Sequence, residues 1–251
     1  MLIQQTIDNL RELRLPDMAQ ALEEQRANAA TQELNFEERL GLLVDAEVHG
    51  RKNKKQQRLY RAAKLKVSAC PEDIDYRARR GLNRQVVSNL ITCDWIERHL
   101  NTIITGPTGV GKTWLGCALG QQATRKGYGV IYKRLSRLLE ELEIAVGDGS
   151  IVKLRSKLAK VDLLILDDWA LAPMTNRGRH ELLEVIDDRI GNGSILITSQ
   201  LPVDQWHAYI GEPTIADAML DRLVHRSHRI ELRGESLRKN LELPLDATGK
   251  E

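Results

Sequence analysis

The sequence has few cysteines, and they form no recognisable pattern. The three, Cys70, Cys93 and Cys117, lie far apart, without CxxC spacing or a nearby histidine pattern. A disulfide scaffold or a cysteine-based metal site needs such pairs. His225 and His228 lie three positions apart, but no acid or thiol with ligand spacing completes a zinc site. We therefore expect reduced thiols, a cytoplasmic location and no structural zinc.

The chain also lacks a long hydrophobic run and a strong net charge. In the N-terminal stretch MLIQQTIDNLRELRL charges lie within a few residues of every apolar position, and no run elsewhere reaches transmembrane length. We expect neither a signal peptide nor a membrane segment. The net charge of +2 averages acidic and basic segments, so only local clusters indicate partners. Hydrophobic residues form 42% of the chain, which suffices for a sizeable core and argues against global disorder.

The first part of the chain has helical periodicity. Over residues 2–47 apolar side chains recur at helical spacing, and Pro16 divides the stretch into two helices. Residues 51–66, RKNKKQQRLYRAAKLK, predict a strongly cationic helix, which we call the basic segment. Residues 68–81 lack clear periodicity and are expected to form a linker. These features predict a helical domain with its basic connecting helix over 1–67, a second domain over 68–240 and a tail over 241–251.

From residue 101 onward, short apolar strands alternate with helices. This alternation predicts an α/β fold with a parallel sheet flanked by helices. The sequence contains no internal repeat that would suggest another architecture. Strands are expected at 101–105, 129–133, 162–166, 194–199 and 229–232. Helices are expected at 114–125, 135–146, 153–160, 179–190 and 214–225.

The stretch GPTGVGKT follows the first of these strands and precedes a helix. A bound triphosphate needs inward-pointing amides, a cation and a hydroxyl group for magnesium, and the P-loop pattern supplies all three. Lys112 is expected to reach the β- and γ-phosphates, and Thr113 to bind Mg²⁺. A glycine-rich turn without a ligand is the alternative. The motif therefore predicts an ATP and Mg²⁺ site, with nucleotide contacts from Gly106, Pro107, Thr108, Gly109, Val110, Gly111, Lys112, Thr113 and Trp114.

Two further strands end in polar residues. The apolar strand VDLLILDDW carries Asp167, expected to hold magnesium through water, and Asp168, expected to orient and deprotonate the attacking water. A helix-capping or loop acid is the alternative. Ser199 and Gln200 follow the strand SILIT, where a strand beside the P-loop strand could direct a side chain at the γ-phosphate. Gln200 is the better candidate because its amide both donates and accepts, and an ordinary polar strand end is the alternative.

Arg222, in DAMLDRLVH, is expected near a helix end. An arginine there can form a surface salt bridge. In an oligomeric ATPase it can instead reach the γ-phosphate of a neighbouring subunit as an arginine finger. Spacing does not decide between the two.

The basic segment holds eight Lys or Arg and no acid. No oppositely charged i,i+4 partner lies inside it, so helix stabilisation explains the run poorly, and contact with DNA phosphates is the favoured interpretation. A solvated charged face is the alternative. A weaker candidate is the helix at 153–160. The expected DNA-binding residues are Lys52, Lys54, Lys55, Arg58, Arg61, Lys64, Lys153, Arg155 and Lys157.

Several stretches together resemble the IstB-like transposition helper ATPases, relatives of the DnaC helicase loader in the AAA+ class. The resemblance covers nearly the whole chain and rests on NFEERLGLLVDAE, RKNKKQQRLYRAAKL, GPTGVGKTWLGCALG, LLILDDW, ILITSQLPVDQWH and IGEPTIADAMLDRLVHRSHRIELRGESLRK. The TSQLP stretch favours the transposition helpers, because the corresponding strand of the loaders tends to end in asparagine.

The resemblance implies an ATP-driven homo-oligomer on target duplex DNA that recruits or stimulates a partner transposase. It makes 106–113 Walker A, Asp167 and Asp168 Walker B, Ser199 and Gln200 the first sensor, and Arg222 the arginine finger. Lys112, Asp168, Gln200 and Arg222 are then the catalytic residues.

Two departures from the AAA+ pattern stand out. Many relatives in the class have Asp-Glu at the end of Walker B, so the shorter Asp168 predicts altered water positioning and slow turnover. Only 29 residues follow Arg222, so no full helical lid is expected. Arg238 is a possible substitute for the sensor arginine of such a lid.

Three other functions are compatible with parts of the pattern. A DnaC-like replicative helicase loader is the alternative within the same class. A P-loop small-molecule kinase has no use for the basic segment. A nucleotide-gated scaffold that barely hydrolyses ATP agrees with Asp168 and the missing lid.

Overall fold

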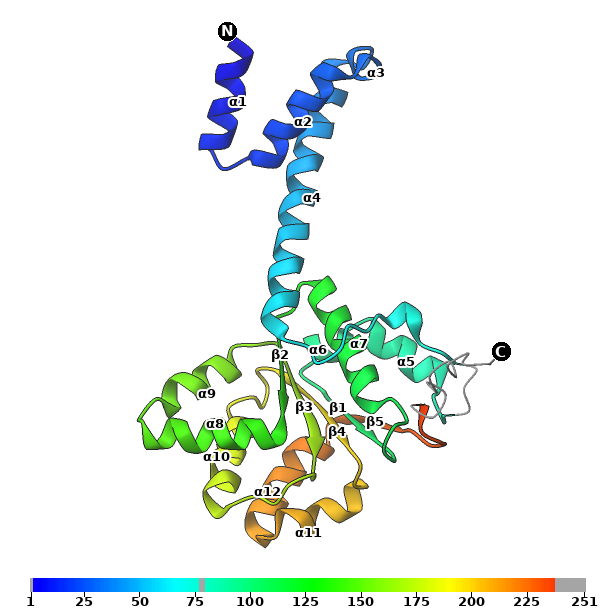
Figure 1. The fold of residues 1–251 in the computed structure, drawn as a ribbon, viewed down its shortest axis with the longest axis vertical. Coiled ribbons are helices and arrows are strands. Elements are labelled where there is room, and N and C mark those ends of the chain that lie inside the picture. The colour runs from blue at the N-terminus through cyan, green and yellow to red at the C-terminus, as the bar shows by residue number, and fades with distance from the viewer. Residues whose placement is uncertain (1, 77–79, 238–251) are drawn as a thin grey trace, which may run out of the picture. The chain divides into compact units, whose positions relative to one another are not determined.

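The computed structural model describes residues 2–76 and 80–237 (Figure 1). The chain divides between Arg58 and Leu59 into two compact units. The domain boundaries expected at 67/68 and 240/241 stay predictions, and the 241–251 tail lies outside the described residues.

The first unit is helical. Pro16 occupies the first turn of the second helix, where its missing amide proton costs nothing. The fourth helix begins with a reciprocal cap, in which the amide of Glu38 donates to Asn35 Oδ1 and the amide of Asn35 to Glu38 Oε2, both at 2.9 Å. This helix is 28 residues long. It begins before the basic segment and continues through most of it. The helices are α1 (Leu2–Glu12), α2 (Pro16–Ala27), α3 (Ala29–Gln32) and α4 (Phe36–Ala63), whose residues from Leu59 onward belong to the second unit.

A buried carboxylate joins α4 to α2 within this unit. Glu47 Oε2 accepts hydrogen bonds from the amides of Asp17 and Met18 at 3.0 Å, which caps the start of α2, and Oε1 accepts one from Arg51 Nε at 2.7 Å. The two helices approach closely at Gly50, where a Cβ atom would lie 2.2 Å from the Asp17 carboxylate. Glu47 therefore caps α2 through backbone amides while it pairs with Arg51 of its own helix.

The second unit contains a five-stranded parallel sheet in the order β2-β3-β4-β1-β5. All five expected strands are present, with ends shifted by up to three residues. The largest shift is in β3, which continues through both acids to Trp169, with a register irregularity after Leu166. The strands are β1 (Asn101–Thr105), β2 (Val130–Arg134), β3 (Leu163–Trp169), β4 (Ser194–Ser199) and β5 (Ser227–Glu231).

Helices cover both faces of this sheet (Figure 1). Neighbouring strand residues point to opposite faces. Ile103 accordingly belongs to a core with α8, α10 and α12, and Ile104 to a core with α5 and α7. The five expected helices are present, and α5, α6 and α11 are additional. The helices are α5 (Arg84–Ile91), α6 (Asp94–Glu97), α7 (Lys112–Lys126), α8 (Leu135–Gly147), α9 (Ile151–Ala159), α10 (Asn176–Asp187), α11 (Trp206–Ile210) and α12 (Pro213–Val224).

The structure bears on membrane helices, metal sites and a helical lid only within the described residues. Within residues 2–76 and 80–237, no helix is long and apolar enough to cross a membrane. The same residues contain no group of three or more His, Cys, Asp or Glu side chains arranged to hold a metal ion. No helix follows β5 up to residue 237, and Arg238 lies outside the described residues.

Candidate functional site

The P-loop joins the carboxyl end of β1 to the start of α7. Its glycines are required by close approaches as well as by their backbone angles. At Gly106 (φ 146°) a Cβ atom would lie 2.2 Å from the carbonyl oxygen of Leu232, and at Gly109 (φ 85°) 2.0 Å from Ser236 Oγ. The residues after β5 therefore pack directly on the loop, and the Leu237 amide donates to the Gly109 carbonyl at 3.0 Å.

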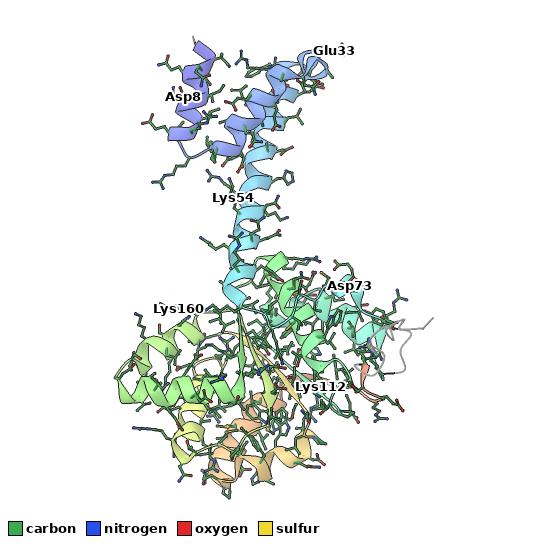
Figure 2. All side chains as sticks on the ribbon, viewed as in Figure 1. Asp8, Glu33, Lys54, Asp73, Lys112 and Lys160 are labelled. Atoms are coloured by element: carbon green, nitrogen blue, oxygen red, sulfur yellow. The ribbon has the colours of Figure 1, made fainter. Side chains whose placement is uncertain are left out.

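Lys112 opens α7 and is only 8% exposed (Figure 2). Its ammonium donates to the carbonyl oxygens of Gly106 and Pro107 at 2.7 and 2.8 Å. These contacts hold the ammonium inside the P-loop, where the phosphates of a nucleotide would bind. Exchange of the neutral carbonyl acceptors for phosphate oxygens would give stronger hydrogen bonds, because donor and acceptor would then carry opposite charges.

Asp167 is a fully buried carboxylate in the middle of a hydroxyl cluster. Its Oδ1 accepts hydrogen bonds from Thr113 Oγ1 at 2.8 Å and from Thr198 Oγ1 at 2.5 Å. The two expected magnesium ligands, Thr113 and Asp167, thus lie in direct contact although they are 54 residues apart in sequence. Hydroxyl and carboxylate oxygens are the donors that magnesium prefers, so this pair fits the metal.

Two residues outside the motifs contact the other oxygen of this carboxylate. Tyr132, on β2, donates its phenol to Asp167 Oδ2 at 2.5 Å. Burial, together with this hydrogen bond, raises the pKa of Tyr132, so the phenol remains a donor at neutral pH. Lys66 Nζ lies 3.5 Å from the same oxygen. We expected neither contact, because Tyr132 resembles any strand residue and Lys66 is one cation among eight in the basic segment.

Asp168 differs from its neighbour in exposure and backbone. Its side chain is 23% exposed, and its φ of 60° lies in the left-handed region, which aspartate tolerates better than most residues. The amide donates to Thr198 Oγ1 at 3.2 Å, while Lys66 Nζ and Arg134 Nε each lie 3.9 Å from Oδ2. The side chain therefore faces the cleft described next.

A cleft of about 730 Å³ lies over the P-loop. This volume is within the usual range for ligand pockets. Trp114 and Val67 add apolar surface to its wall, and Lys112, Thr113 and Asp168 add the charged and polar groups expected from the motifs. The loop glycines, the held lysine and the oxygen pair Thr113–Asp167 fit a magnesium-bound nucleoside triphosphate.

Ser199 and Gln200 lie at the end of β4, which pairs with β1 so that Ser199 faces Thr105. Ser199 is buried, and its hydroxyl forms hydrogen bonds with the backbone carbonyls of Trp169 and Leu201. Its side chain is therefore engaged within the fold. Gln200 is exposed, lines the cleft and accepts a hydrogen bond from Thr108 Oγ1 at 2.8 Å. The geometry therefore brings Gln200, and not Ser199, to the loop.

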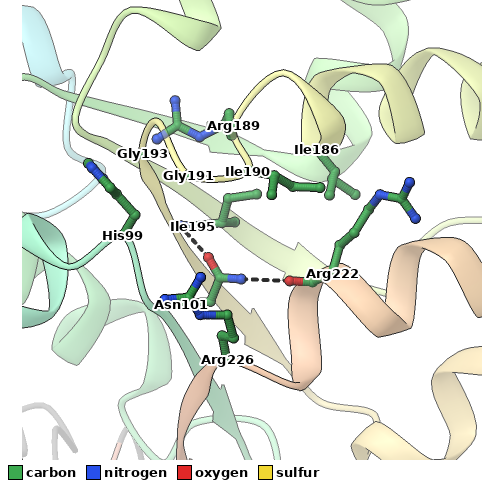
Figure 3. Close-up of a pocket in the computed structure, with 10 residues that line it drawn as sticks. All are labelled: His99, Asn101, Ile186, Arg189, Ile190, Gly191, Gly193, Ile195, Arg222 and Arg226. Carbon is green, nitrogen blue, oxygen red and sulfur yellow. Dashed lines mark hydrogen bonds between the residues drawn. The ribbon is translucent and has the colours of Figure 1, made fainter.

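Arg222 lies at the opposite, amino-terminal edge of the sheet (Figure 3). Its carbonyl accepts a hydrogen bond from Asn101, the first residue of β1, at 3.1 Å. Its guanidinium forms an ion pair with Asp187 and donates to the Ala218 carbonyl. Arg226 lines the same small pocket and is exposed. Arg222 is thus remote from the P-loop of its own chain.

The expected DNA-binding cations differ in their partners. Lys54, which Figure 2 labels, is exposed and pairs with Asp17 at 2.7 Å. Arg155 is held by Glu181 and Glu184 at 2.6 and 3.0 Å and is only partly exposed. The remaining members are exposed, namely Lys52, Lys55, Arg58, Arg61, Lys64, Lys153 and Lys157.

Known proteins resemble this chain over most of its length. The sequence profile of the IstB-like ATP binding proteins matches residues 8–243. An insertion sequence ATP-binding protein of Sinorhizobium fredii is 50% identical over 240 residues, which cover 96% of this chain and 98% of the relative. The ATP-binding protein of insertion sequence IS21 of Pseudomonas aeruginosa is 31% identical over 229 residues, covering 91% and 86% of the two chains.

Solved structures show the same fold at low identity. DnaI superposes with a TM-score of 0.56 at 19% identity, covering 70% of this chain and 93% of that chain. The DnaC helicase loader gives a TM-score of 0.52 at 17% identity, covering 69% and 98%. The parallel sheet with its flanking helices is therefore the fold found in these AAA+ proteins.

Proposed function

This chain belongs to the family of IstB-like ATP-binding proteins of insertion sequences, and we propose that it is an ATPase that assembles on duplex DNA and recruits or stimulates a partner transposase. The observation that carries the proposal is the contact of the P-loop Thr113 with the buried Asp167, beside a held Lys112 and a partly exposed Asp168. An N-terminal helical domain is part of the proposal.

Each residue of the cleft then has a role. Bound ATP with magnesium supplies the phosphoanhydride bond and part of the charge neutralisation. Lys112 would leave its two carbonyl acceptors for the β- and γ-phosphates, while Thr113 and Asp167 would hold the metal. Asp168 accepts a proton from the attacking water, and Gln200 orients that water or the γ-phosphate.

Two substitutions test these roles separately. Lys112→Ala should abolish ATP binding because it removes the cation from the loop. Asp168→Asn should retain ATP binding and lower turnover by at least about a hundredfold, because general base catalysis contributes on this scale. Asparagine also tolerates the left-handed backbone at this position. Direct nucleotide titration and phosphate release measure the two effects. Normal turnover by Asp168→Asn would place the base elsewhere.

Arg222 is proposed to act on ATP bound by a neighbouring subunit. Its distance from the P-loop of its own chain leaves only this possibility for a catalytic role, and its ion pair with Asp187 must open first. Arg226 is the matched comparison, since it lines the same pocket and is exposed. An arginine finger typically raises turnover by about a thousandfold or more.

Mixing experiments test the proposed finger. Arg222→Ala should bind ATP but hydrolyse it poorly, and mixing it with Lys112→Ala should recover activity at interfaces that combine one intact arginine with one intact P-loop. The same experiment with Arg226→Ala shows which arginine acts. Absence of recovery at every ratio, with co-assembly demonstrated by size, contradicts a finger supplied by the neighbour.

DNA binding is assigned to the exposed cations of the basic segment, with Lys153 and Lys157 as secondary contacts. Arg155 is the least suited of the set because two carboxylates already hold it. Phosphate contacts make binding steeply salt-dependent, with a slope of about 0.9 log units for each contact. They do not discriminate sequence, so weakening should be similar for any duplex.

A salt series tests this assignment. The triple variant Lys52→Ala, Lys55→Ala, Arg58→Ala should flatten the slope by about 2 to 3 log units per tenfold change in salt, measured by fluorescence anisotropy on a labelled duplex. ATP affinity without DNA is the control and should not change. An unaltered slope would make the segment a solvated face.

The transposase partner is supported by the insertion sequence relatives. Their names favour transposition over helicase loading, which is the alternative within the class. Co-purification of the two proteins on DNA with ATP tests the partnership. A chain that instead binds only a replicative helicase would be a loader.

A further inference from the structure

Among the described residues, Asp167 has one cationic contact, and that cation comes from the basic segment. Three of its contacts are hydroxyl groups, from Thr113, Thr198 and Tyr132, and the fourth is the Lys66 ammonium at 3.5 Å. Hydroxyls satisfy hydrogen bonds but leave the negative charge uncompensated. A carboxylate with no solvent exposure needs an opposite charge nearby. Lys66 meets that need.

The same ammonium also faces Asp168, at 3.9 Å from Oδ2. Lys66 therefore lies against both acids expected at Walker B. A magnesium ion held by Thr113 and Asp167 would place a second, doubly charged cation beside the same carboxylate. Like charges a few ångströms apart repel strongly in a partly buried site.

Lys66 can leave this position. Its side chain is 29% exposed and lines the nucleotide cleft, so the ammonium has a path to solvent. It follows the end of α4, where Lys64 has a left-handed φ of 50°, and it is not held in a regular helix. By contrast, Thr198 and Tyr132 lie on strands of the sheet and stay near the carboxylate.

We propose that Lys66 is a positioning residue that neutralises Asp167 and Asp168 in the nucleotide-free chain and competes with magnesium for them. The proposal rests on the metal role given above to Thr113 and Asp167. Its consequence is a higher magnesium requirement for nucleotide binding than the oxygen ligands alone would impose. Lys66 must withdraw when the metal is bound.

A different role would give the opposite signature. If Lys66 binds phosphate, its removal weakens nucleotide binding at every magnesium concentration. If it competes with the metal, its removal strengthens binding at low magnesium and leaves binding at saturating magnesium nearly unchanged. The two roles are therefore separated by the magnesium dependence and not by turnover.

The experiment titrates a fluorescent ATP analogue onto the full chain over a series of magnesium concentrations. Lys66→Met keeps the length of the side chain and removes its charge. It should lower the magnesium concentration that gives half-maximal binding by about three- to tenfold. Lys66→Arg should stay close to wild type because it keeps the charge. Lys160→Ala, which removes an exposed lysine elsewhere in the unit, should have no effect.

The outcomes are distinguishable. An unchanged or higher magnesium requirement in Lys66→Met, or weaker binding at saturating magnesium, overturns the competition. If wild-type binding does not depend on magnesium at all, the proposed metal site fails as well. Thermal unfolding of each variant shows whether it is folded. If Lys66→Met does not fold, Lys66→Gln provides the same uncharged comparison.

Discussion

The two edges of the sheet each contain a buried charge, and they compensate it in opposite ways. At the carboxyl edge, Asp167 is held entirely by side chains. At the amino edge, Arg189 is 1% exposed and donates to four backbone carbonyls, those of Leu158, Val161, Asp162 and Ser194, at 2.5 to 3.2 Å.

The difference lies in what can move. The Lys66 ammonium can withdraw to admit a ligand while the hydroxyls of Thr198 and Tyr132 stay near the carboxylate, whereas backbone carbonyls at strand and helix ends cannot leave without unfolding. Burial lowers the pKa of Arg189 to about 10, against the opposing effect of Asp162, so the guanidinium remains charged at neutral pH. The amino edge is thus a fixed structural element, and the carboxyl edge is suited to exchange partners.

The largest expected effect comes from breaking the fixed edge. Arg189→Leu removes the donor for all four carbonyls and should lower the free energy of unfolding by about 3 to 5 kcal/mol. Urea unfolding followed by circular dichroism measures the change. Arg177→Leu, at an exposed position on α10, is the matched control and should change stability by less than about 0.5 kcal/mol. Equal effects of the two substitutions would contradict the structural role.

The next effect concerns the exchangeable edge. Asp167→Asn keeps the shape of the side chain but removes its charge, so magnesium-dependent nucleotide binding should weaken by about ten- to a hundredfold. Its unfolding free energy should change by less than half of the Arg189→Leu effect, because the buried charge is removed together with its cost. The two measurements are nucleotide titration and urea unfolding. If Asp167→Asn lost much stability but bound nucleotide normally, Asp167 would be the structural charge, which contradicts the proposed contrast with Arg189.

A smaller effect is expected when one hydroxyl is removed from the carboxylate. Tyr132→Phe deletes the hydrogen bond to Asp167 Oδ2 and should lower the unfolding free energy by about 1 kcal/mol. Tyr128→Phe, at a half-buried tyrosine just before β2, serves as the control. If Tyr132→Phe lowered the unfolding free energy as much as Arg189→Leu, the prediction would be wrong. The side-chain partners of Asp167 would then be as important for stability as the backbone partners of Arg189.

The smallest effect involves a third buried charge, Glu47 in the first unit. Burial by itself raises the pKa of Glu47, but hydrogen bonds from Arg51 and from the amides of Met18 and Asp17 lower it below its ordinary value. Since the folded-state pKa is the lower one, the ionised carboxylate stabilises the unit above the ordinary value of 4.5, and this contribution is lost as pH falls through the folded-state pKa.

Glu47→Gln tests this dependence. The stability difference between wild type and variant, from urea unfolding, should be constant from pH 7 to pH 5.5 and should shrink as pH falls from 4.5 towards 3. Glu37→Gln, at an exposed position on the same helix, should show no such trend. If the stability difference between wild type and Glu47→Gln did not depend on pH, the proposed stabilisation by the ionised Glu47 carboxylate would be contradicted.

Local patterns predicted the parts of the site that local geometry determines. The P-loop pattern identified the loop, and the strands 101–105 and 194–199 have the expected bounds. The short helices α6 and α11, of four and five residues, have too few turns to show a period. The contact of Lys66 with Asp167 joins residues 101 positions apart, and no spacing rule reaches that distance. The sequence did not distinguish between an ion pair and an arginine finger as the role of Arg222. Its ion pair with Asp187 shows the contact that Arg222 makes in the nucleotide-free chain and does not test the finger role.

Trp169, which directly follows the two acids, packs against Trp206 with ring centroids 5.0 Å apart and ring planes tilted by 33°. Trp206 donates its indole N–H to the Leu201 carbonyl, one residue beyond Gln200. The ends of β3 and β4 are thus joined by two indoles in van der Waals contact, both almost fully buried. The chain has four tryptophans, and Trp114 lines the nucleotide cleft itself. Trp114 therefore lines the cleft, Trp169 adjoins Asp168, and Trp206 packs against Trp169, so near-ultraviolet circular dichroism and tryptophan emission should respond to changes at this site without any attached dye.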